Sequence, residues 1–212
     1  ALIGGDTTRG PLSITVGVTG FVDQAHSFKR SNASAGDAIF VSGTIADARL
    51  GLQLLLQQND TVGCTQADRE FLLDRLNRPV PRLDVASLLS SYPLAAIDLS
   101  DGLLADLQHI CEASQLGARI NLNRIPLSTA AHNRLHNRID WPLILNAGDD
   151  YELCFTCRPE NISAMQQAMD THQIQVTQIG EITAESGIVC ELDGQPFSLD
   201  NLSGYDHFSG ER

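Results

Sequence analysis

The sequence predicts an α+β fold, a layered α/β sandwich in which a mixed β-sheet carries packed helices. Strand-like apolar runs alternate with helix-like periodic segments along most of the chain. The chain closes on two strand-like runs that are joined by Asp193-Gly194, a dipeptide typical of tight hairpins. With 212 residues, of which 42% are hydrophobic, the chain is long enough to bury a substantial core.

The first strands and helices follow from alternation and from leucine spacing. Residues 11–22 alternate apolar and small polar side chains, which predicts a strand. A short apolar run over 38–43 ends in glycine and predicts a buried strand. Apolar residues recur on one face over 46–58 and again over 68–77, so we expect a helix in each segment. The polar, small-residue segment 29–37 is the expected domain boundary.

The middle of the chain contains a junction between a strand and a helix. Residues 84–91 predict a short helix, and the apolar run 94–99 predicts a buried strand. Ser100 is a residue type that caps helices, so we expect a helix over 101–116 that stops at Gly117. The remaining expected elements are a strand over 119–122, a weaker helix over 127–137, a strand over 151–157, a helix from Pro159 to about His172, and strands near 174–182, 187–192 and 196–199.

Composition excludes several classes of protein. The chain has 26 acidic and 14 basic residues, a net charge of −12, which argues against non-specific nucleic-acid binding because the surface repels phosphate backbones. No apolar run approaches the length of a membrane span. Five scattered cysteines argue against a disulfide framework and for a reducing, cytoplasmic compartment. Cys154 and Cys157 form a C-x-x-C pair, but within a strand they face opposite sides of the sheet.

Three acidic turns carry the candidate chemistry. The first, Gly4-Gly5-Asp6-Thr7-Thr8, joins two glycines to a carboxylate and two hydroxyls, which are hard oxygen donors. The second, Asp98-Leu99-Ser100-Asp101-Gly102, lies where a strand meets a helix, and free N–H groups at a helix N-terminus favour phosphate. The alternative for this turn is simple helix capping, which explains Ser100 and Asp101 but not Asp98.

The third acidic turn is Gly148-Asp149-Asp150-Tyr151-Glu152, between two apolar segments. Adjacent carboxylates repel each other, so they need either solvent or a metal ion nearby, and a solvated turn is the plain alternative. The sequence contains no P-loop, no G-x-G-x-x-G turn and no kinase catalytic-loop motif. Any phosphoryl transfer would therefore rely on magnesium held by carboxylates.

Taken in order, the three turns resemble the thiamine-monophosphate kinases, a family of the AIR-synthetase-like ATP-binding superfamily. Eight segments in order make this resemblance specific, and they span Leu2 to Phe208. The segments are LIGGDTTRGPLSITV, KRSNASAGDAIFVSGT, RPVPRLDVA, AIDLSDGLLADL, GARINL, AGDDYELCFT, IGEI and GYDHF.

The resemblance implies direct in-line transfer of the ATP γ-phosphoryl group to thiamine monophosphate, with several Mg²⁺ ions, giving thiamine diphosphate. It implies an AIR-synthetase C-terminal-domain-like fold over residues 30–212, and it makes residues 1–29 the last strands of an N-terminal domain that binds ATP and Mg²⁺. Most of that domain is missing from this sequence, so we expect the chain alone to be inactive and the full-length enzyme to be a homodimer. The implied ligands are Asp6, Asp98 and Asp101 for Mg²⁺; Gly5, Asp6, Arg30 and Ser100 for ATP; and Asp149 and Tyr205 for the substrate.

The sequence departs from the family pattern at several positions. The family commonly has GGED where this chain has Ala147-Gly148-Asp149-Asp150, so Asp149 reaches one methylene less far. Ala46 and Ala48 stand where a glycine and a serine are usual. Two other interpretations stay open, namely another ATP-dependent enzyme of the superfamily, such as AIR or selenophosphate synthetase, and a non-catalytic nucleotide-binding or assembly domain.

Overall fold

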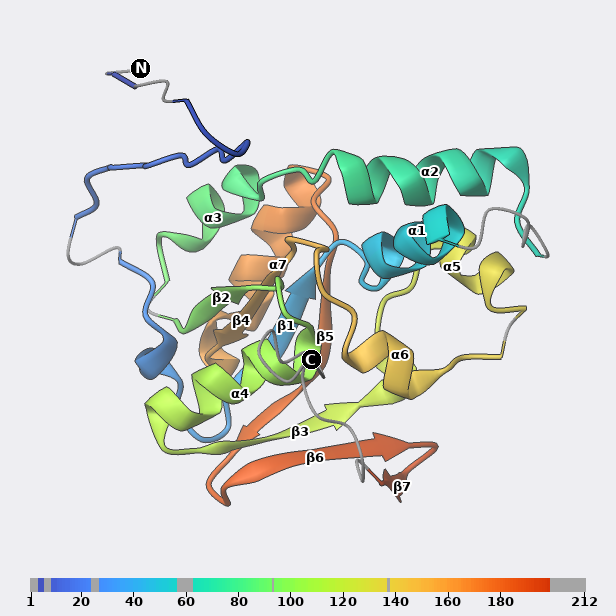
Figure 1. The fold of residues 1–212 in the computed structure, drawn as a ribbon. Helices are drawn as coiled ribbons and strands as arrows, with labels where there is room; N and C mark the ends of the chain where they lie inside the picture. The colour runs from blue at the N-terminus through green and yellow to red at the C-terminus, as the bar shows by residue number, and fades with distance from the viewer. Residues whose placement is uncertain are drawn as a thin grey trace.

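The fold, seen in a computed structural model, is a seven-stranded mixed sheet with helices on both faces (Figure 1). The structure describes residues 4–5, 9–23, 27–56, 63–92, 94–136 and 138–198. Within this part of the chain the strand order is β2-β4-β1-β5-β3-β6-β7. The mixed sheet with packed helices confirms the predicted fold class.

One to three α-helices separate successive strands up to β5, and β5, β6 and β7 follow one another directly. The strands are β1 (Ala38–Ser42), β2 (Ala96–Asp98), β3 (Gly117–Asn121), β4 (Leu153–Cys157), β5 (Val176–Thr183), β6 (Gly187–Leu192) and β7 (Gln195–Phe197). The α-helices are α1 (Asp47–Leu56), α2 (Gln66–Asn77), α3 (Leu83–Leu89), α4 (Leu103–Ser114), α5 (Thr129–Arg134), α6 (Trp141–Leu145) and α7 (Ile162–Thr171). Three short 3₁₀ turns are η2 (Arg30–Asn32), η3 (Leu122–Arg124) and η4 (Pro159–Asn161).

Antiparallel pairing dominates the sheet. Strand β1 lies between β4 and β5 and is antiparallel to both, and only β3 and β6 pair in parallel within the described sheet. The predicted hairpin is confirmed, since Leu192 pairs with Gln195 across a two-residue turn. Both turn residues, Asp193 and Gly194, have positive φ angles, as a type I′ turn requires.

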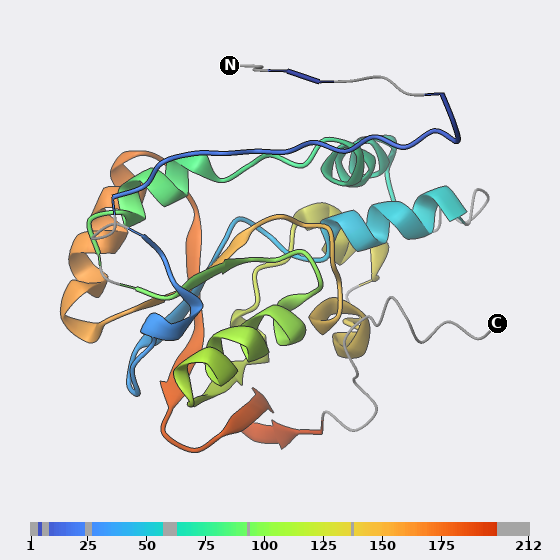
Figure 2. The ribbon, with the colours of Figure 1, turned by 60° about the vertical axis from the view of Figure 1, so that its left-hand side comes forward.

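Helices lie on both faces of the sheet (Figure 2), and each face buries its own apolar cluster. On one face, Ile39 and Val41 of β1 pack with the apolar sides of α4 and α6. On the other face, Phe40 stacks on Phe155 of β4 and packs with α3 and α7. The alternation of β1 between faces follows from the two-residue period of a strand.

The cysteine pair of β4 obeys the same alternation. Cys154 lies in the α4-side cluster, Cys157 lies in the α7-side cluster, and both are free thiols. The predicted separation of the two thiols is confirmed. Burial raises the pKa of Cys157 to about 11, so the thiol stays protonated and unreactive near neutral pH.

A third cluster forms where α1, α2 and α5 meet beside the sheet. Leu50, Leu54 and Leu72 are fully buried there with Ala130 and Ala131. A capping box at Thr65 and Asp68 fixes the start of α2, in which each residue's side chain accepts from the other's backbone N–H. This corner brings Arg75 of α2 to the third acidic turn, where its guanidinium donates to the carbonyl of Asp150 at 3.4 Å.

The predicted strand over 11–22 is wrong. Residues 9–23 are exposed throughout, they form no strand, and none of the seven strands of the sheet pairs with them. Leu12, Ile14 and Phe21 are among the most exposed apolar side chains of the described chain. Alternation specifies which side chains share a face, but a strand also needs a neighbour that accepts its backbone hydrogen bonds.

Two smaller differences concern helices. Helix α6 was not predicted, because its five residues are too few to show a period, and its first residue, Trp141, is buried. Helix α4 is shorter at both ends than the predicted 101–116, and it ends on Gln115 in a left-handed conformation rather than at Gly117. Among the described residues no helix is long and apolar enough to cross a membrane.

Candidate functional site: two joined acidic turns

The second and third acidic turns are joined backbone to backbone. The N–H of Asp149 donates to the carbonyl of Ser100 at 3.0 Å, and the N–H of Tyr151 donates to the carbonyl of Leu99 at 2.9 Å. The N–H of Leu99 donates back to the carbonyl of Glu152 at 2.8 Å. These bonds extend the β2–β4 pairing beyond the strands and hold residues 98–102 against residues 148–152.

Two glycines permit this close approach. A Cβ atom on Gly148 would lie 2.5 Å from the carbonyl oxygen of Ser100. A Cβ atom on Gly102 would lie 2.9 Å from the backbone of Asn146, and Gly102 also has a φ of 119°. Glycine is therefore required at both positions on steric grounds.

Three carboxylates and one phenol are exposed on the joined turns. They are Asp98, Asp101, Asp149 and Tyr151. Asp149 and Tyr151 have φ angles of 68° and 52°, an uncommon conformation for residues other than glycine. Partial burial and the negative charges of Asp149, Asp98 and Asp101 raise the pKa of the Tyr151 phenol, so the three carboxylates lie within electrostatic reach of one group.

The expected cap of α4 by Ser100 is wrong. The N-cap of α4 is Gly102, and no side chain caps it. The backbone N–H groups of Ser100, Asp101 and Gly102 all donate to one oxygen of Asp106. These amides are therefore not free for phosphate, contrary to the expectation for a helix N-terminus.

Asp150 points away from the exposed carboxylates, into the protein. It is 1% exposed, and its two oxygens accept from the N–H groups of Ala46 and Ala48 at the start of α1. Burial raises the pKa of Asp150 to about 7, against the lowering effect of these two hydrogen bonds. Asp149 and Asp150 thus avoid mutual repulsion by facing opposite sides, and Asp149 is the member of the pair that is accessible to a ligand.

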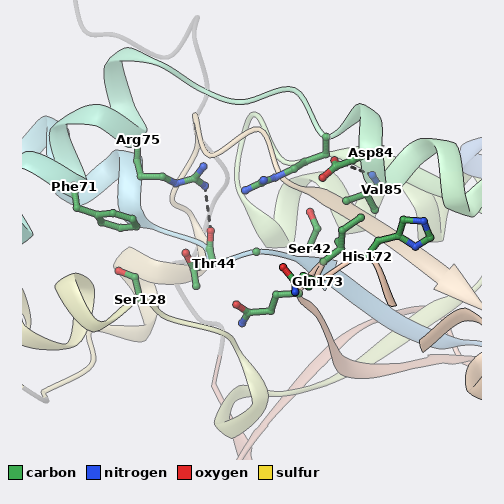
Figure 3. Close-up of a pocket in the computed structure, with 13 residues that line it drawn as sticks. Ser42, Thr44, Phe71, Arg75, Asp84, Val85, Ser128, His172 and Gln173 are labelled. Atoms are coloured by element: carbon green, nitrogen blue, oxygen red, sulfur yellow. Dashed lines mark hydrogen bonds between the residues drawn. The ribbon is translucent and has the colours of Figure 1, made fainter. Parts of the chain in front are cut away.

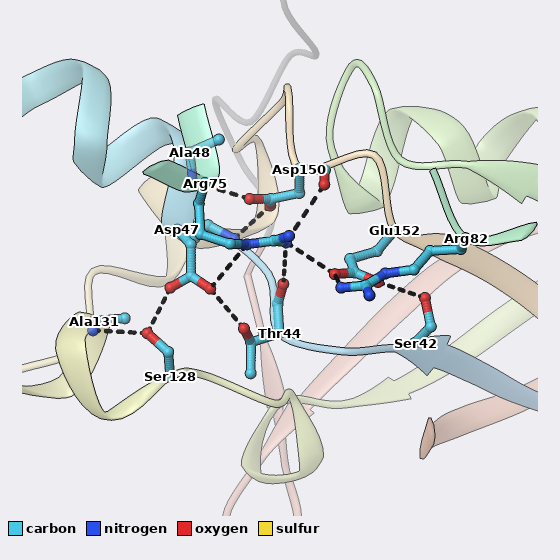
Figure 4. A network of polar contacts seen from close by, with 11 residues as sticks. Ser42, Thr44, Asp47, Ala48, Arg75, Arg82, Ser128, Ala131, Asp150 and Glu152 are labelled. Atoms are coloured by element: carbon cyan, nitrogen blue, oxygen red, sulfur yellow. Dashed lines mark hydrogen bonds and ion pairs between the residues drawn. The ribbon is translucent and has the colours of Figure 1, made fainter. Parts of the chain in front are cut away.

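Glu152 is the centre of a buried polar network (Figure 4). Its carboxylate accepts from Arg75 at 2.8 Å, from the Nε of Arg82 at 2.6 Å and from the hydroxyl of Ser42 at 2.6 Å. The two nitrogens of Arg82 bind both oxygens of Glu152, which is the bidentate geometry of a strong ion pair. This network fixes β4 to α2 and to the segment before α3.

A second buried carboxylate, Asp47 of α1, completes the network. It accepts from the hydroxyls of Thr44 and Ser128, both at 2.5 Å, and the Nε of Arg75 lies 3.7 Å away. Burial raises the pKa of Asp47 in spite of these partners. The donors of this region thus satisfy internal carboxylates.

A cavity of about 450 Å³ lies beside the network (Figure 3). Its wall includes Arg75, Arg82, Thr44, Phe71 and Gln173. The two arginines share the single carboxylate of Glu152, and Asp47 lies 3.7 Å from Arg75, so their two charges are balanced only when both carboxylates are ionised.

The structure does not bring all predicted site residues together. Arg30 lies at the far end of α4, where its carbonyl accepts from Ser114, and α4 is a 12-residue helix about 18 Å long. Gly5 is exposed in the N-terminal segment. Asp6 and Tyr205 lie outside the described residues. Of the predicted site residues, the joined turns thus bring together the exposed Asp98, Asp101 and Asp149 and the partly exposed Ser100, and the predicted role of each residue stays a prediction.

The exposed carboxylates suit a hard cation but do not enclose one. No arginine or lysine of the described segments forms an ion pair with Asp98, Asp101 or Asp149. Carboxylates that lack a protein cation are the ligand type that Mg²⁺ takes up, usually with water and phosphate oxygens as further ligands. No group of three or more potential ligands among the described residues closes on a single metal position.

Asp106, Tyr151 and the Glu152 network were not predicted from the sequence. A signal for Asp106 exists, since it lies among the buried leucines of α4 and a carboxylate on an apolar stripe needs donors. Arg82 lies in the matched RPVPR segment, but sequence alone does not pair it with Glu152, 70 residues later.

Comparison with known proteins places this site in context. The family model described as AIR synthase related protein, C-terminal domain, matches residues 34–193. The thiamine-monophosphate kinase of Escherichia coli (strain K12) is 43% identical over 209 residues, which cover 98% of this chain and 63% of that protein. The chain therefore spans less than two thirds of this curated relative's length.

Solved structures of thiamine-monophosphate kinases have a similar fold. The crystal structure of thiamine-monophosphate kinase from Stenotrophomonas maltophilia K279a has a TM-score of 0.71 and 36% identity, over 82% of this chain and 55% of that one. A structure of AaThiL complexed with AMPPCP and TMP has a TM-score of 0.69 and 29% identity, over 85% of this chain and 54% of that one.

Proposed function

The chain belongs to the AIR synthase related proteins through its C-terminal domain, and from this premise we propose that it is the C-terminal part of an ATP-dependent thiamine-monophosphate kinase. The reaction is transfer of the ATP γ-phosphoryl group to the phosphate of thiamine monophosphate, which gives thiamine diphosphate. In this proposal residues 1–29 are the end of an N-terminal nucleotide-binding domain, and residues 30–212 are the C-terminal domain. The full-length enzyme is a homodimer.

The observation that carries the proposal is the joined pair of acidic turns. Three exposed carboxylates without a basic partner in the described segments lie on two turns that share backbone hydrogen bonds. A triphosphate is strongly anionic, so such a surface binds it only through divalent cations. The likeness to a protein solved with AMPPCP, an ATP analogue, and TMP supports the same ligands here.

Asp98 and Asp101 are the proposed Mg²⁺ ligands, and Asp6 is a third from the N-terminal segment. Bound Mg²⁺ neutralises phosphate charge and aligns the reacting oxygens. Ser100 contacts ATP, and Asp149 and Tyr205 contact the thiamine monophosphate. Arg30 is the proposed further ATP contact, although it lies about one helix length from Asp101, so this contact requires a nucleotide that extends along α4 or a site built by another part of the full-length enzyme.

The test is the reaction itself. A protein that joins this chain to the part of its relatives that it does not span is expected to make thiamine diphosphate from thiamine monophosphate, ATP and Mg²⁺. The 212-residue chain alone is expected to give no product, because it lacks the proposed N-terminal domain. Formation of aminoimidazole ribonucleotide or selenophosphate by the full-length protein, with no thiamine diphosphate, would overturn the proposal.

A further inference from the structure

Asp106 is a buried carboxylate on the apolar side of α4. It is 2% exposed and lies among Leu103, Leu107 and Ile110, which are all buried. A carboxylate in such surroundings loses its hydration and persists only where donors replace the lost water. Its donors therefore indicate what the residue does.

The donors of Asp106 are the amides of the second acidic turn. Its Oδ2 atom accepts from the N–H groups of Ser100, Asp101 and Gly102 at 3.0, 3.0 and 3.1 Å. Three successive amides thus converge on one oxygen, an arrangement in which proteins otherwise bind anions. The turn is wrapped around a carboxylate of its own chain.

This wrapping determines what the turn presents to solvent. Since its amides face Asp106, the groups left to the outside are the exposed carboxylates of Asp98 and Asp101. The carbonyl of Ser100 is used by Asp149 of the neighbouring turn. The backbone N–H groups of residues 99–102 therefore all have acceptors within the protein, Glu152 for Leu99 and Asp106 for the other three.

Backbone amides at the start of α1 also donate to an internal carboxylate. Both oxygens of Asp150 accept from the N–H groups of Ala46 and Ala48 there. A helix N-terminus is otherwise an ordinary site for phosphate, because its amides are free and its dipole favours negative charge. At the start of α1 and in the turn that precedes α4, backbone amides that could otherwise bind a phosphate thus donate to an internal carboxylate.

We infer that Asp106 is a positioning residue of the nucleotide site, which holds the carboxylates of the 98–102 turn outward and keeps its three amides from binding phosphate directly. Phosphate then reaches the backbone of this turn only through a cation, and the Ser100 hydroxyl stays available for the proposed ATP contact. The identity of the ligand rests on the proposed function. The hydrogen bonds from the three amides to Asp106 do not depend on it.

The first experiment follows the amides of residues 100–102 in the 212-residue chain by NMR, with inorganic phosphate as the probe and no divalent cation. In the wild type these amides are expected to exchange slowly with solvent and to keep their shifts when phosphate is added. In Asp106→Ala they are expected to exchange at least about tenfold faster, because their acceptor is gone, and to shift with phosphate.

Two variants make this test specific. Asp106→Asn keeps an acceptor oxygen, so the amides are expected to stay within about threefold of wild-type exchange and not to respond to phosphate. Asp47→Asn also changes a buried carboxylate near a helix start but does not touch the turn, so it controls for general destabilisation. Amides that respond to phosphate in the wild type would overturn the inference, as would equally fast exchange in Asp47→Asn.

The second experiment uses the full-length protein and the Mg²⁺ concentration that gives half-maximal kinase activity. Asp106→Ala is expected to raise it at least about tenfold, and Asp106→Asn and Asp47→Asn to leave it within about threefold of the wild type. An equal rise in Asp47→Asn would reduce Asp106 to a stabilising residue. A wild type without kinase activity would remove the proposed function but leave the amide result standing.

Should Asp106→Ala not fold, Asp106→Asn still tests the claim. Fast exchange of the amides of residues 100–102 in Asp106→Asn, at an unchanged melting temperature, would overturn the inference.

Discussion

Within residues 149–152, acidic side chains on the solvent side and on the buried side have different partners. Asp149 faces solvent with Tyr151, whereas Asp150 and Glu152 are buried and fully hydrogen-bonded to the chain. The outward carboxylates have no protein cation beside them in the described segments, and the inward ones have arginines or backbone amides. The difference shows that partners, not residue type, decide whether a carboxylate stays accessible to a ligand or holds the fold.

The largest expected effect comes from an outward carboxylate. In the full-length protein, Asp98→Asn is expected to lower kcat at least about a hundredfold, because a neutral amide is a far weaker Mg²⁺ ligand. Its melting temperature is expected to stay unchanged, since Asp98 is exposed. Asp74→Asn removes an exposed carboxylate of α2 and serves as the control, with kcat within about twofold of the wild type. Wild-type turnover in a soluble Asp98→Asn variant would remove this residue from the site.

An inward carboxylate should show the reverse. Glu152→Gln leaves two guanidinium groups without their carboxylate, so the free energy of unfolding is expected to fall by about 3–5 kcal/mol. Glu181→Gln, which breaks a half-exposed pair with Arg119, should cost less than about 1 kcal/mol. Urea unfolding of the 212-residue chain measures both. Equal losses in the two variants would contradict the structural role of the Glu152 network.

The pH dependence of stability sharpens the contrast for Asp150. Burial raises its pKa from 3.8 to about 7, so the folded chain holds this proton more tightly than the unfolded chain. The resulting stabilisation is fully present below about pH 4 and is lost as the pH rises through 7, a change on the order of 4 kcal/mol. Asp150→Asn is expected to remove this part of the slope in unfolding measurements between pH 4.5 and 8. Parallel curves for variant and wild type would contradict the assignment.

The smallest expected effect concerns the loop that Asp150 holds. Ala46 and Ala48 are both fully buried alanines that donate to Asp150, but Ala46 has a φ of 69°, which glycine adopts without strain. Ala46→Gly is therefore expected to be about 1–2 kcal/mol less destabilising than Ala48→Gly, which weakens a helix. Chemical denaturation of the two variants measures this difference. A larger loss in Ala46→Gly would show that its methyl packing outweighs the backbone strain.

Much of the fold could be predicted because it depends on local apolar periodicity. The buried strand β1, the hairpin at Asp193 and the opposite faces of Cys154 and Cys157 all follow from short-range patterns. The strand predicted over 11–22 is wrong, because a strand needs a pairing neighbour and alternation within its own residues does not specify one.

The candidate site was predictable only in part, because its decisive contacts are long-range. The sequence showed that Asp149 and Asp150 adjoin, but which one is buried depends on Ala46, 104 residues earlier than Asp150. Similarly, the residue type of Ser100 predicts that its hydroxyl caps α4. In the structure no side chain caps this helix, and the backbone N–H of Ser100 donates to Asp106, six residues later. Local rules identified the acidic turns, and tertiary contacts decided the direction of each side chain.

Binding of a non-hydrolysable ATP analogue to the full-length protein, with and without Mg²⁺, tests the central claim most directly. Because internal carboxylates accept from backbone amides at the start of α1 and in the turn that precedes α4, we expect affinity to fall at least about a hundredfold when Mg²⁺ is removed. We also expect Asp98→Asn to lose most of this Mg²⁺ dependence. Equal affinity with and without Mg²⁺ would contradict the account, since the triphosphate would then be held by the protein alone.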